Sequence, residues 1–178
     1  MVECIVRGQG GELTEDELRE VAGHLGSDCA FFFSSGSAVC SGRGEQIAEL
    51  AALPPRKLLV FKPDEGLSTP AVYRALDVTG VSSADPAQLV DRFQRGVEQQ
   101  ADYVNDLEAP AFSLLPVLRE LKQRLRGRLT AVMSGSGSAV VAVVTGPEDV
   151  EFGRAVGKEF GVRVWEAEFA QRVPGEWY

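Results

Sequence analysis

The pattern of apolar and polar positions in the first fifty residues predicts one helix and two short strands. Residues 14–25 have apolar side chains at helical spacing, and Thr14 and Glu17 form the capping box that begins such a helix. Two apolar runs follow at residues 29–33 and 37–40, and the Ser-Ser-Gly turn between them predicts a strand pair. This helix with its hairpin is too small to be a domain by itself.

A longer segment with its own helices and strands follows the Pro54-Pro55 break. Residues 57–62 are an apolar strand run, and residues 63–68 are a predicted loop because of their Pro, Asp and Gly content. The elements predicted after this loop are a helix from Asp85-Pro86 to about Asp102, a helix from Pro110 to Gly127 with Leu114, Leu118, Leu121 and Leu125 facing the core, strands at 129–133 and 139–145, a helix at 147–160, and a strand at 162–169. The order is thus strand, helix, helix, strand, strand, helix, strand.

This order predicts an α+β fold in which helices pack on one face of an antiparallel sheet, close to the ferredoxin-like split βαβ arrangement. The 178 residues are near the usual size of one domain, or of one domain with a fragment of another. We place the boundary after residue 56. Residues 1–56 then hold the helix and hairpin, and residues 57–178 hold the α/β sandwich.

Composition and charge disfavour several broad classes of function. A hydrophobic share of 44% with 25% charged residues is typical of a globular protein rather than a disordered one. The net charge of -8 disfavours a nucleic-acid binder, and the basic run at residues 122–128 is better explained as the end of an amphipathic helix. The longest apolar stretch, residues 139–144, is far shorter than the roughly 20 residues that span a membrane.

Cysteine and histidine usage disfavours disulfide and metal chemistry. Three cysteines without a C-x-x-C pair fit a reducing compartment, and the single histidine, His24, leaves a zinc site without most of its usual ligands. We therefore expect no structural metal. We also find neither the pattern of a signal peptide nor that of a plastid transit peptide in this sequence.

Residues 134–138 are the first candidate for chemistry. Gly135 and Gly137 alternate with Ser134 and Ser136, so that backbone N–H groups and hydroxyls could converge on a phosphate. A Gly/Ser run between two strands is also an ordinary hairpin connection, and both interpretations stay open on local features. The lysine of a Walker A loop is missing, which excludes a P-loop.

Asp28 and the segment around Tyr73 are two further candidates. Asp28 lies at a helix end before the apolar residues 29–33, so we expect a partly desolvated carboxylate that could accept a proton from a substrate hydroxyl. A capping or turn aspartate is the competing interpretation. Thr69 is a predicted helix N-cap, which puts Tyr73 one turn into the helix, where its ring could stack on a base or only staple the helix.

Several motifs occur together and in one order, and their combination resembles a known family. The chain is similar to the plant-type and algal 4-diphosphocytidyl-2-C-methyl-D-erythritol kinases of the GHMP superfamily, over nearly its whole length from about Glu12 to Tyr178. The similar segments are G-S-D-C-A-F-F-F from Gly26, G-R-G-E from Gly42, K-P from Lys62, S-T-P-A-V-Y from Ser68, N-D-L-E from Asn105, M-S-G-S-G-S from Met133, E-A-E-F from Glu166 and E-W-Y from Glu176. Their occurrence in combination makes the resemblance specific.

The resemblance implies ATP-dependent phosphorylation of the 2-hydroxyl of 4-diphosphocytidyl-2-C-methyl-D-erythritol, in the plastid and in the non-mevalonate route to isoprenoids. It implies that Asp28 is the catalytic aspartate, and that Tyr73, with Thr69 and Pro70 beside it, contributes to the cytosine pocket for a cytidine diphosphate derivative. The loop of residues 134–137 would lie next to the transferred phosphate, and ATP with Mg²⁺ would be the cofactors. Residues 1–56 would be the remnant of a GHMP kinase N-terminal domain, followed by the C-terminal domain.

Some features of the family are not found in this sequence. The Gly-rich ATP loop, of the form G-L-G-G-G-S-S-N, should precede the helix at 14–25, and the glycine-rich residues 7–11 lack its serines. Ala30 replaces the family's proline after the aspartate, which leaves this backbone less constrained. We therefore expect that this chain alone does not turn over ATP. A measurable kinase rate that depends on Asp28 would contradict that expectation.

Two other interpretations compete with an active kinase. The chain could be a non-catalytic relic that binds a cytidine nucleotide, or a regulatory module that forms homo-oligomers through an exposed hairpin with unpaired strand edges. An in-frame Gly-Gly-Gly-Ser-Ser segment upstream in the gene would favour the kinase over the relic. Titration with cytidine diphosphate and size-exclusion chromatography would separate both from the oligomerisation module.

Overall fold

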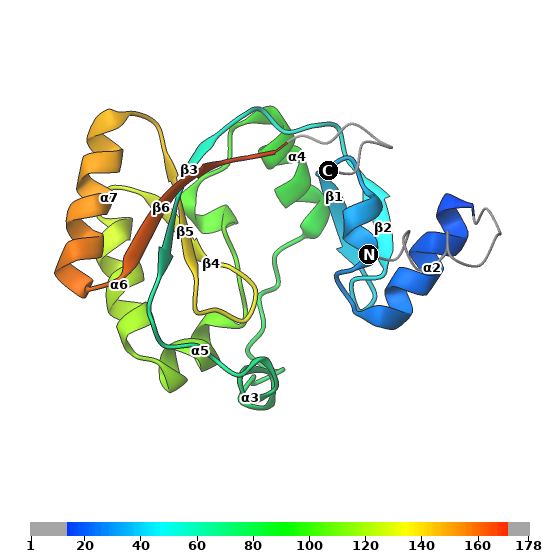
Figure 1. The fold of residues 1–178 in the computed structure, drawn as a ribbon, viewed down its shortest axis with the longest axis horizontal. Helices are drawn as coiled ribbons and strands as arrows, with labels where there is room; N and C mark the ends of the chain where they lie inside the picture. Colours follow the sequence, from blue (N-terminus) through cyan, green and yellow to red (C-terminus); the bar gives the residue numbers. More distant parts are fainter. Residues whose placement is uncertain (1–13, 171–178) are drawn as a thin grey trace, which may run out of the picture. The chain divides into compact units, whose positions relative to one another are not determined.

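The computed structural model describes residues 14–170, which fall into two compact units. The first unit extends to Leu53, and the second comprises Pro54–Phe169 (Figure 1). Two segments that carry sequence-based predictions, residues 7–11 and 176–178, lie outside the described residues. The assignment of residues 1–56 and 57–178 to two GHMP kinase domains stays a prediction.

The first unit begins with the predicted helix. α2 (Glu15–Leu25) has Thr14 as its N-cap; the Thr14 hydroxyl accepts from Glu17 N at 3.3 Å, and the Glu17 carboxylate accepts from Thr14 N at 2.8 Å. This reciprocal pair is the predicted capping box, and it satisfies two N–H groups that a helix start leaves unpaired. The bond from the Thr14 N–H, with that from its hydroxyl, lowers the pKa of the Glu17 carboxyl.

Residues 30–33 form a 3₁₀ turn with Cys29 as its N-cap, so the strand predicted at residues 29–33 is wrong. η1 (Ala30–Phe33) satisfies its backbone locally, and Ser34 N donates to Phe31 O at 2.9 Å. Aromatic residues favour a strand by propensity, but a strand needs a neighbour for its N–H and C=O groups. In the described part of this unit, the sheet is a single strand pair that does not include these residues. The aromatic run therefore turns on itself.

The hairpin of this unit joins two other segments. β1 (Ala38–Ser41) was predicted at residues 37–40, and it pairs antiparallel with β2 (Gln46–Glu49), for which no strand was predicted. The turn between them contains Gly42 and Gly44, with φ of 68° and 114°. These left-handed angles favour glycine, which explains why the G-R-G-E segment forms the turn.

The second unit is a four-stranded antiparallel sheet with helices on one face, which confirms the predicted α+β fold. Its strands are β3 (Lys57–Lys62), β4 (Thr130–Met133), β5 (Val140–Val144) and β6 (Arg163–Glu168). They lie in the order β4-β5-β3-β6, and each neighbouring pair is antiparallel, as in the ferredoxin-like arrangement. The covering helices are α6 (Val117–Arg126) and α7 (Pro147–Phe160) (Figure 1).

The core of this unit lies between the sheet and the two covering helices. Alternate residues of β3 point to this side, and Leu59 and Phe61 are fully buried. They belong to one cluster with the buried leucines of α6, which follow the predicted helical spacing: Leu118, Leu121 and Leu125. Burial of each such side chain stabilises the fold by about 1.5–3 kcal/mol.

Glycine and proline divide the long helices predicted for this unit. α4 (Pro86–Arg95) ends at Gly96, which takes the left-handed φ of 65°, and only a 3₁₀ turn, η2 (Gln100–Asp102), follows. The next predicted helix is two helices, α5 (Glu108–Leu114) and α6, because Pro116 has no N–H with which to continue α5. Leu114 ends α5 before this break and is 48% exposed, so its predicted place in the core stripe is wrong. None of the helices described for this chain has the length and apolar character needed to cross a membrane.

Candidate functional site

Asp28 follows α2 in the first unit and lies beside the glycine-rich turn of the hairpin. A Cβ built at Gly44 would lie 2.8 Å from the Ser27 carbonyl oxygen and 3.2 Å from Asp28 Oδ1. A backbone oxygen at 2.8 Å is too close for any Cβ, so only glycine lets the turn approach Ser27 and Asp28 this closely. The G-R-G-E turn therefore supports the backbone that carries the carboxylate.

The turn is held closed by its own glutamate. Arg43 N donates to Glu45 Oε2 at 2.7 Å, and Gly44 N donates to the Ser41 carbonyl at 3.0 Å. Backbone hydrogen bonds from Glu45 and then from Arg43 lower the pKa of the Glu45 carboxyl. The carboxylate therefore stays charged in its position against these N–H groups.

Asp28 is exposed, so the partial desolvation predicted for it is not found. It lies in the turn between α2 and η1, and turn residues stay at the surface because water satisfies their backbone groups. The pKa of the nearby Cys40 thiol is raised by burial and, to a smaller degree, by the Asp28 charge. The carboxylate is thus accessible to a substrate hydroxyl, as a general base must be.

The Gly/Ser segment of residues 134–138 is a tight loop between β4 and β5 in the second unit. Ser134 N donates to the Ala139 carbonyl at 2.9 Å, and Gly137 N donates to the Ser134 carbonyl at 3.0 Å. Gly135 and Gly137 have φ of 54° and 86°, a region that favours glycine. The segment is therefore a hairpin connection, as one of the two interpretations predicted.

The two glycines of this loop have different surroundings. A Cβ at Gly137 would lie 2.8 Å from Met133 Sδ and 3.2 Å from Leu67 Cδ1, so this glycine allows close packing. A Cβ at Gly135 would meet no atom of the described residues within 4 Å, and Gly135 is exposed. The backbone at Gly135 is thus open to a group such as a phosphate, and a hairpin connection is compatible with phosphate contact.

α3 (Thr69–Arg74) brings the predicted substrate residues next to this loop. Thr69 Oγ1 and Ser136 Oγ are hydrogen-bonded at 2.8 Å, although they lie 67 positions apart in the chain. The N-cap of α3 is Ser68, so the predicted capping role of Thr69 is wrong by one residue. The Thr69 hydroxyl contacts the loop instead, and two motifs that were predicted separately meet in one unit.

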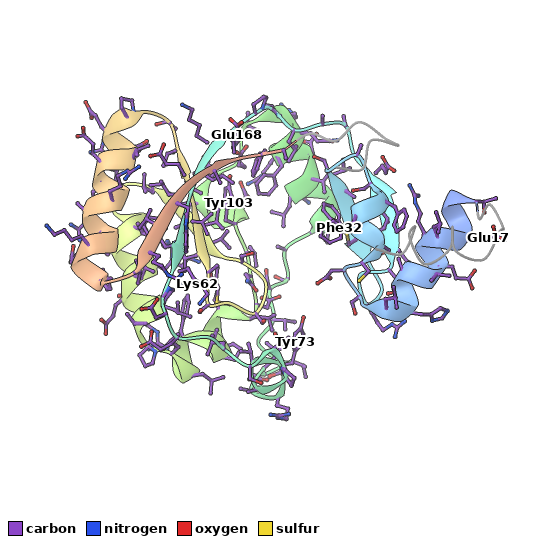
Figure 2. All side chains as sticks on the ribbon, viewed as in Figure 1. Glu17, Phe32, Lys62, Tyr73, Tyr103 and Glu168 are labelled. Carbon is purple, nitrogen blue, oxygen red and sulfur yellow. The ribbon has the colours of Figure 1, made fainter. Side chains whose placement is uncertain are left out.

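Pro70 and Tyr73 are exposed on α3. Proline in the first turn of a helix costs little, because its missing N–H would have had no partner within the helix. Val72 is fully buried, whereas Tyr73, which Figure 2 labels on α3, is 58% exposed. An exposed ring is suited to stacking on a base.

Sequence reasoning missed the contacts that hold the segment before α3. Ser138 Oγ donates to the Glu65 carbonyl at 2.6 Å, and Lys62 Nζ donates to the carbonyls of Pro63 and Glu65 at 2.7 and 3.2 Å. The K-P segment marked this region. No sequence signal could have shown that Ser138, which is buried, reaches a backbone carbonyl 73 positions away.

The donors on this loop are suited to an anionic group such as a phosphate rather than to a metal cation. N–H groups and serine hydroxyls are the groups from which phosphate oxygens accept hydrogen bonds, and Gly135 leaves space for them. Within residues 14–170, no group of three His, Cys, Asp or Glu side chains is placed to hold a metal ion. Magnesium that arrived with ATP would take ligands from the phosphates themselves.

Comparison with known proteins finds relatives along nearly the whole chain. Residues 86–162 match the family model described as GHMP kinases C terminal. The chain is 40% identical over 176 residues to the chloroplastic 4-diphosphocytidyl-2-C-methyl-D-erythritol kinase of Arabidopsis thaliana, which covers 95% of this chain and 46% of that relative. The kinase of the same name from Protochlamydia amoebophila is 35% identical over 173 residues, which covers 95% of this chain and 54% of that relative. The chain spans about half the length of these curated relatives.

Two solved structures are similar to this chain in fold, and one of them is also similar in sequence. A crystal structure of a 4-(cytidine 5'-diphospho)-2C-methyl-D-erythritol kinase matches with a TM-score of 0.71 at 34% identity, and covers 89% of this chain and 58% of that one. The homoserine kinase of Cytophaga hutchinsonii matches with a TM-score of 0.65 at 14% identity, and covers 94% of this chain and 61% of that one. The homoserine kinase shares the fold alone, whereas the first structure shares sequence as well.

Proposed function

Because this chain belongs to the 4-diphosphocytidyl-2-C-methyl-D-erythritol kinase family of the GHMP kinases, we propose that it serves in the reaction for which these relatives are named. That reaction transfers the γ-phosphoryl group of ATP to the 2-hydroxyl of 4-diphosphocytidyl-2-C-methyl-D-erythritol, in the non-mevalonate route to isoprenoids. The observation that carries the proposal is the 40% identity over 176 residues, which includes segments of both units.

In this proposal Asp28 accepts the proton of the substrate hydroxyl as its oxygen attacks the γ-phosphorus of ATP. The new oxygen–phosphorus bond forms, the bond to the β-phosphate oxygen breaks, and the proton passes to the Asp28 carboxylate. The exposure of Asp28 in its turn supports this role, since a substrate can approach it. The close packing of Gly44 supports it as well, because it restrains the backbone that carries the carboxylate.

The exposed residues of α3 form one side of the proposed cytidine site. Tyr73 stacks on the cytosine ring, with Thr69 and Pro70 beside it. The hydrogen bond between Thr69 and Ser136 supports this placement, because it joins the helix to the Gly/Ser loop. A ligand with a base and phosphates could thus touch both elements at once.

The loop of Ser134, Gly135, Ser136 and Gly137 lies next to the transferred phosphoryl group in this proposal. Its glycines leave the backbone open at Gly135, where N–H and hydroxyl donors can meet phosphate oxygens. Bound ATP with Mg²⁺ supplies the phosphoryl group and neutralises charge on the phosphates. Phosphoryl transfer depends mostly on positioning and charge, so a rigid loop of donors is the contribution expected from this unit.

We place the reaction in the plastid. The plant relatives, such as that of Arabidopsis thaliana, are named chloroplastic. A fluorescent fusion of the protein expressed from its complete gene should therefore accumulate in plastids. Accumulation in the cytosol would contradict this part of the proposal.

The test of the reaction is the transfer of labelled phosphate from ATP to 4-diphosphocytidyl-2-C-methyl-D-erythritol by the protein expressed from its complete gene. Asp28→Asn should lower kcat by about 100- to 10,000-fold, the usual range for the loss of a general base. Asp91→Asn is the matched control, because Asp91 is 61% exposed on α4, where it pairs with Arg95. It should leave kcat unchanged.

One possible result would contradict the role of Asp28, and another would contradict the reaction itself. If Asp28→Asn keeps more than about a tenth of the wild-type kcat, Asp28 is not the general base. If the wild-type protein labels another alcohol, such as homoserine, but not the cytidine substrate, the proposed reaction itself is wrong.

A further inference from the structure

The side chain of Asn105 connects the segment before α5 to the loop of the proposed phosphate site. Asn105 Nδ2 donates to the Met133 carbonyl at 2.7 Å and to the Gly135 carbonyl at 2.8 Å. Its Oδ1 accepts from Leu107 N at 3.0 Å. The side-chain amide uses its donor hydrogens and its acceptor in these three bonds, which together define its orientation.

A buried ion pair supports the same end of β4. Glu108, the first residue of α5, pairs with Lys122 of α6 and also accepts from Met133 N at 2.9 Å. The Lys122 side chain is 8% exposed, so its charge is nearly removed from water and is neutralised by a carboxylate that is hydrogen-bonded in turn. Met133 thus has its N–H held by Glu108 and its carbonyl held by Asn105, immediately before the loop.

Part of this network has a purely structural explanation. β4 is an edge strand, and Gln100 covers its outer side by donating to the Ala131 carbonyl at 3.1 Å and accepting from Ala131 N at 2.8 Å. Such contacts satisfy backbone groups that an edge leaves unpaired. The same explanation covers the bonds to Met133. It does not cover the second bond of Asn105, which reaches past the strand to Gly135.

The bond to Gly135 determines the direction of the next N–H group. A trans peptide is planar, and its C=O and N–H point to opposite sides. With the Met133 carbonyl directed to Asn105, the Ser134 N–H of the same peptide points the other way and donates to Ala139. By the same geometry, the Gly135 carbonyl directed to Asn105 turns the Ser136 N–H away from Asn105.

We propose that Asn105 is a positioning residue, which holds the Gly135 carbonyl so that the Ser136 N–H faces the phosphoryl group to be transferred. The proposal rests on the proposed kinase function, since the phosphoryl group belongs to that reaction. Thr69 holds the Ser136 side chain through its hydroxyl, so the loop is restrained from two sides. Asn105 acts through the loop and touches no reacting atom.

The structural half of the proposal is tested on this chain by NMR relaxation, without any kinase activity. Asn105→Asp replaces the amide donor with a carboxylate that faces two carbonyl oxygens, and Asn105→Ala removes the donor without adding charge. In both variants the amide order parameters of Gly135 and Ser136 should fall from about 0.85 to below about 0.6. Asp106→Asn is the control, because the Asp106 carboxylate accepts from Ser82 N at 2.8 Å and is exposed.

The functional half is tested by kinase assay on the protein expressed from its complete gene. Both Asn105 variants should lower kcat by about 10- to 100-fold, less than the full loss of an oxyanion donor, because the N–H is misdirected but still present. The KM for the cytidine substrate should change by less than about threefold, since the cytidine contacts are elsewhere. Asp106→Asn should change neither parameter.

The outcomes separate the two proposals. Ordered Gly135 and Ser136 amides in both variants would overturn the positioning role, whatever the activity. A disordered loop with wild-type kcat would limit Asn105 to structural support and overturn its link to the phosphate. A wild-type protein without kinase activity would overturn the proposed function and the phosphate role that rests on it, while the NMR comparison would still report on the loop.

Discussion

Gly157 of α7 packs so closely on β6 that replacing it with alanine should destabilise the protein, although alanine usually stabilises a helix relative to glycine. A Cβ at Gly157 would lie 2.1 Å from Val164 Cγ2 and 3.4 Å from the Val162 carbonyl oxygen. Carbon atoms in good contact are about 3.5–4.0 Å apart, so the helix would have to move or Val164 would have to change rotamer. A β-branched side chain has few χ1 alternatives, which makes the second response costly.

Two opposing contributions determine how much Gly157→Ala changes the free energy of unfolding. Alanine is better than glycine in a helix by about 1 kcal/mol. Overpacking costs about 1–3 kcal/mol, and the separation of 2.1 Å puts this contact near the upper end of that range. We therefore expect Gly157→Ala to lower the free energy of unfolding by about 1–2 kcal/mol.

A double-mutant cycle with Val164 separates the two contributions. Val164→Ala removes Cγ2 and leaves the Val164 Cβ at 3.5 Å from the new methyl group, an ordinary contact. In that background Gly157→Ala should raise the free energy of unfolding by up to about 1 kcal/mol, so the two sites are coupled by about 2–3 kcal/mol. Gly23→Ala in α2 is the control for helix propensity, because its nearest neighbour, Glu45 Cβ, would lie at 3.4 Å.

Urea unfolding followed by far-UV circular dichroism measures the free energy of unfolding of each protein at one pH and temperature. The sign of the Gly157→Ala effect is the decisive quantity, since it should differ between the wild-type and Val164→Ala backgrounds. A stabilising effect in the wild-type background, or the same sign in both, would refute the argument that contact with Val164 requires glycine here.

Three further predictions concern the turn beside Asp28, a surface ion pair and the proposed cytidine site. Gly44→Ala places a Cβ 2.8 Å from a backbone oxygen, so kcat should fall by about 10- to 100-fold in a kinase assay, and the melting temperature should fall in calorimetry. An unchanged kcat and melting temperature would contradict the supporting role of the turn. The hydrogen bond from Arg128, the largest of several causes, lowers the pKa of Asp149 to about 2, so the resulting stabilisation is complete above about pH 4 and is lost as the pH falls through 2. Asp149→Asn should therefore lower the melting temperature at pH 7 by an amount that shrinks below pH 4, and a difference independent of pH would count against this cause. Tyr73→Ala should raise the KM for the cytidine substrate by about 5- to 100-fold, because the stacking on the base is lost. It should change the free energy of unfolding by less than about 0.5 kcal/mol, because the ring is exposed. An unchanged KM would show that Tyr73 is not part of the site.

Much of the second unit could be predicted from the sequence because its signals are local. α7 spans Pro147–Phe160 as predicted, with Pro147 in its first turn and Gly161 as its left-handed C-cap. β3 spans the predicted apolar run. Caps, breakers and apolar periodicity act within a few residues, so they can be recognised before any tertiary contact is known.

The errors in the fold arose from two different causes. Gly96 and Pro116 are local breakers, and the sequence itself carries their signal. The 3₁₀ turn at Ala30–Phe33 had no such signal, because strand propensity is realised only where a neighbouring strand accepts and donates hydrogen bonds. The partial desolvation predicted for Asp28 is wrong for the same reason, because that prediction depends on the apolar run that follows.

The sequence by itself determined the helices with strong caps, the alternating apolar strands and the resemblance to 4-diphosphocytidyl-2-C-methyl-D-erythritol kinases. Only the tertiary structure decided which motif residues meet. Thr69 contacts Ser136, Ser138 reaches Glu65, and Asn105 holds Gly135 across separations of 67, 73 and 30 positions in the chain. These contacts depend on how β4, β5 and the segments around α3 and α5 pack together, and no pattern within a few residues contains that information.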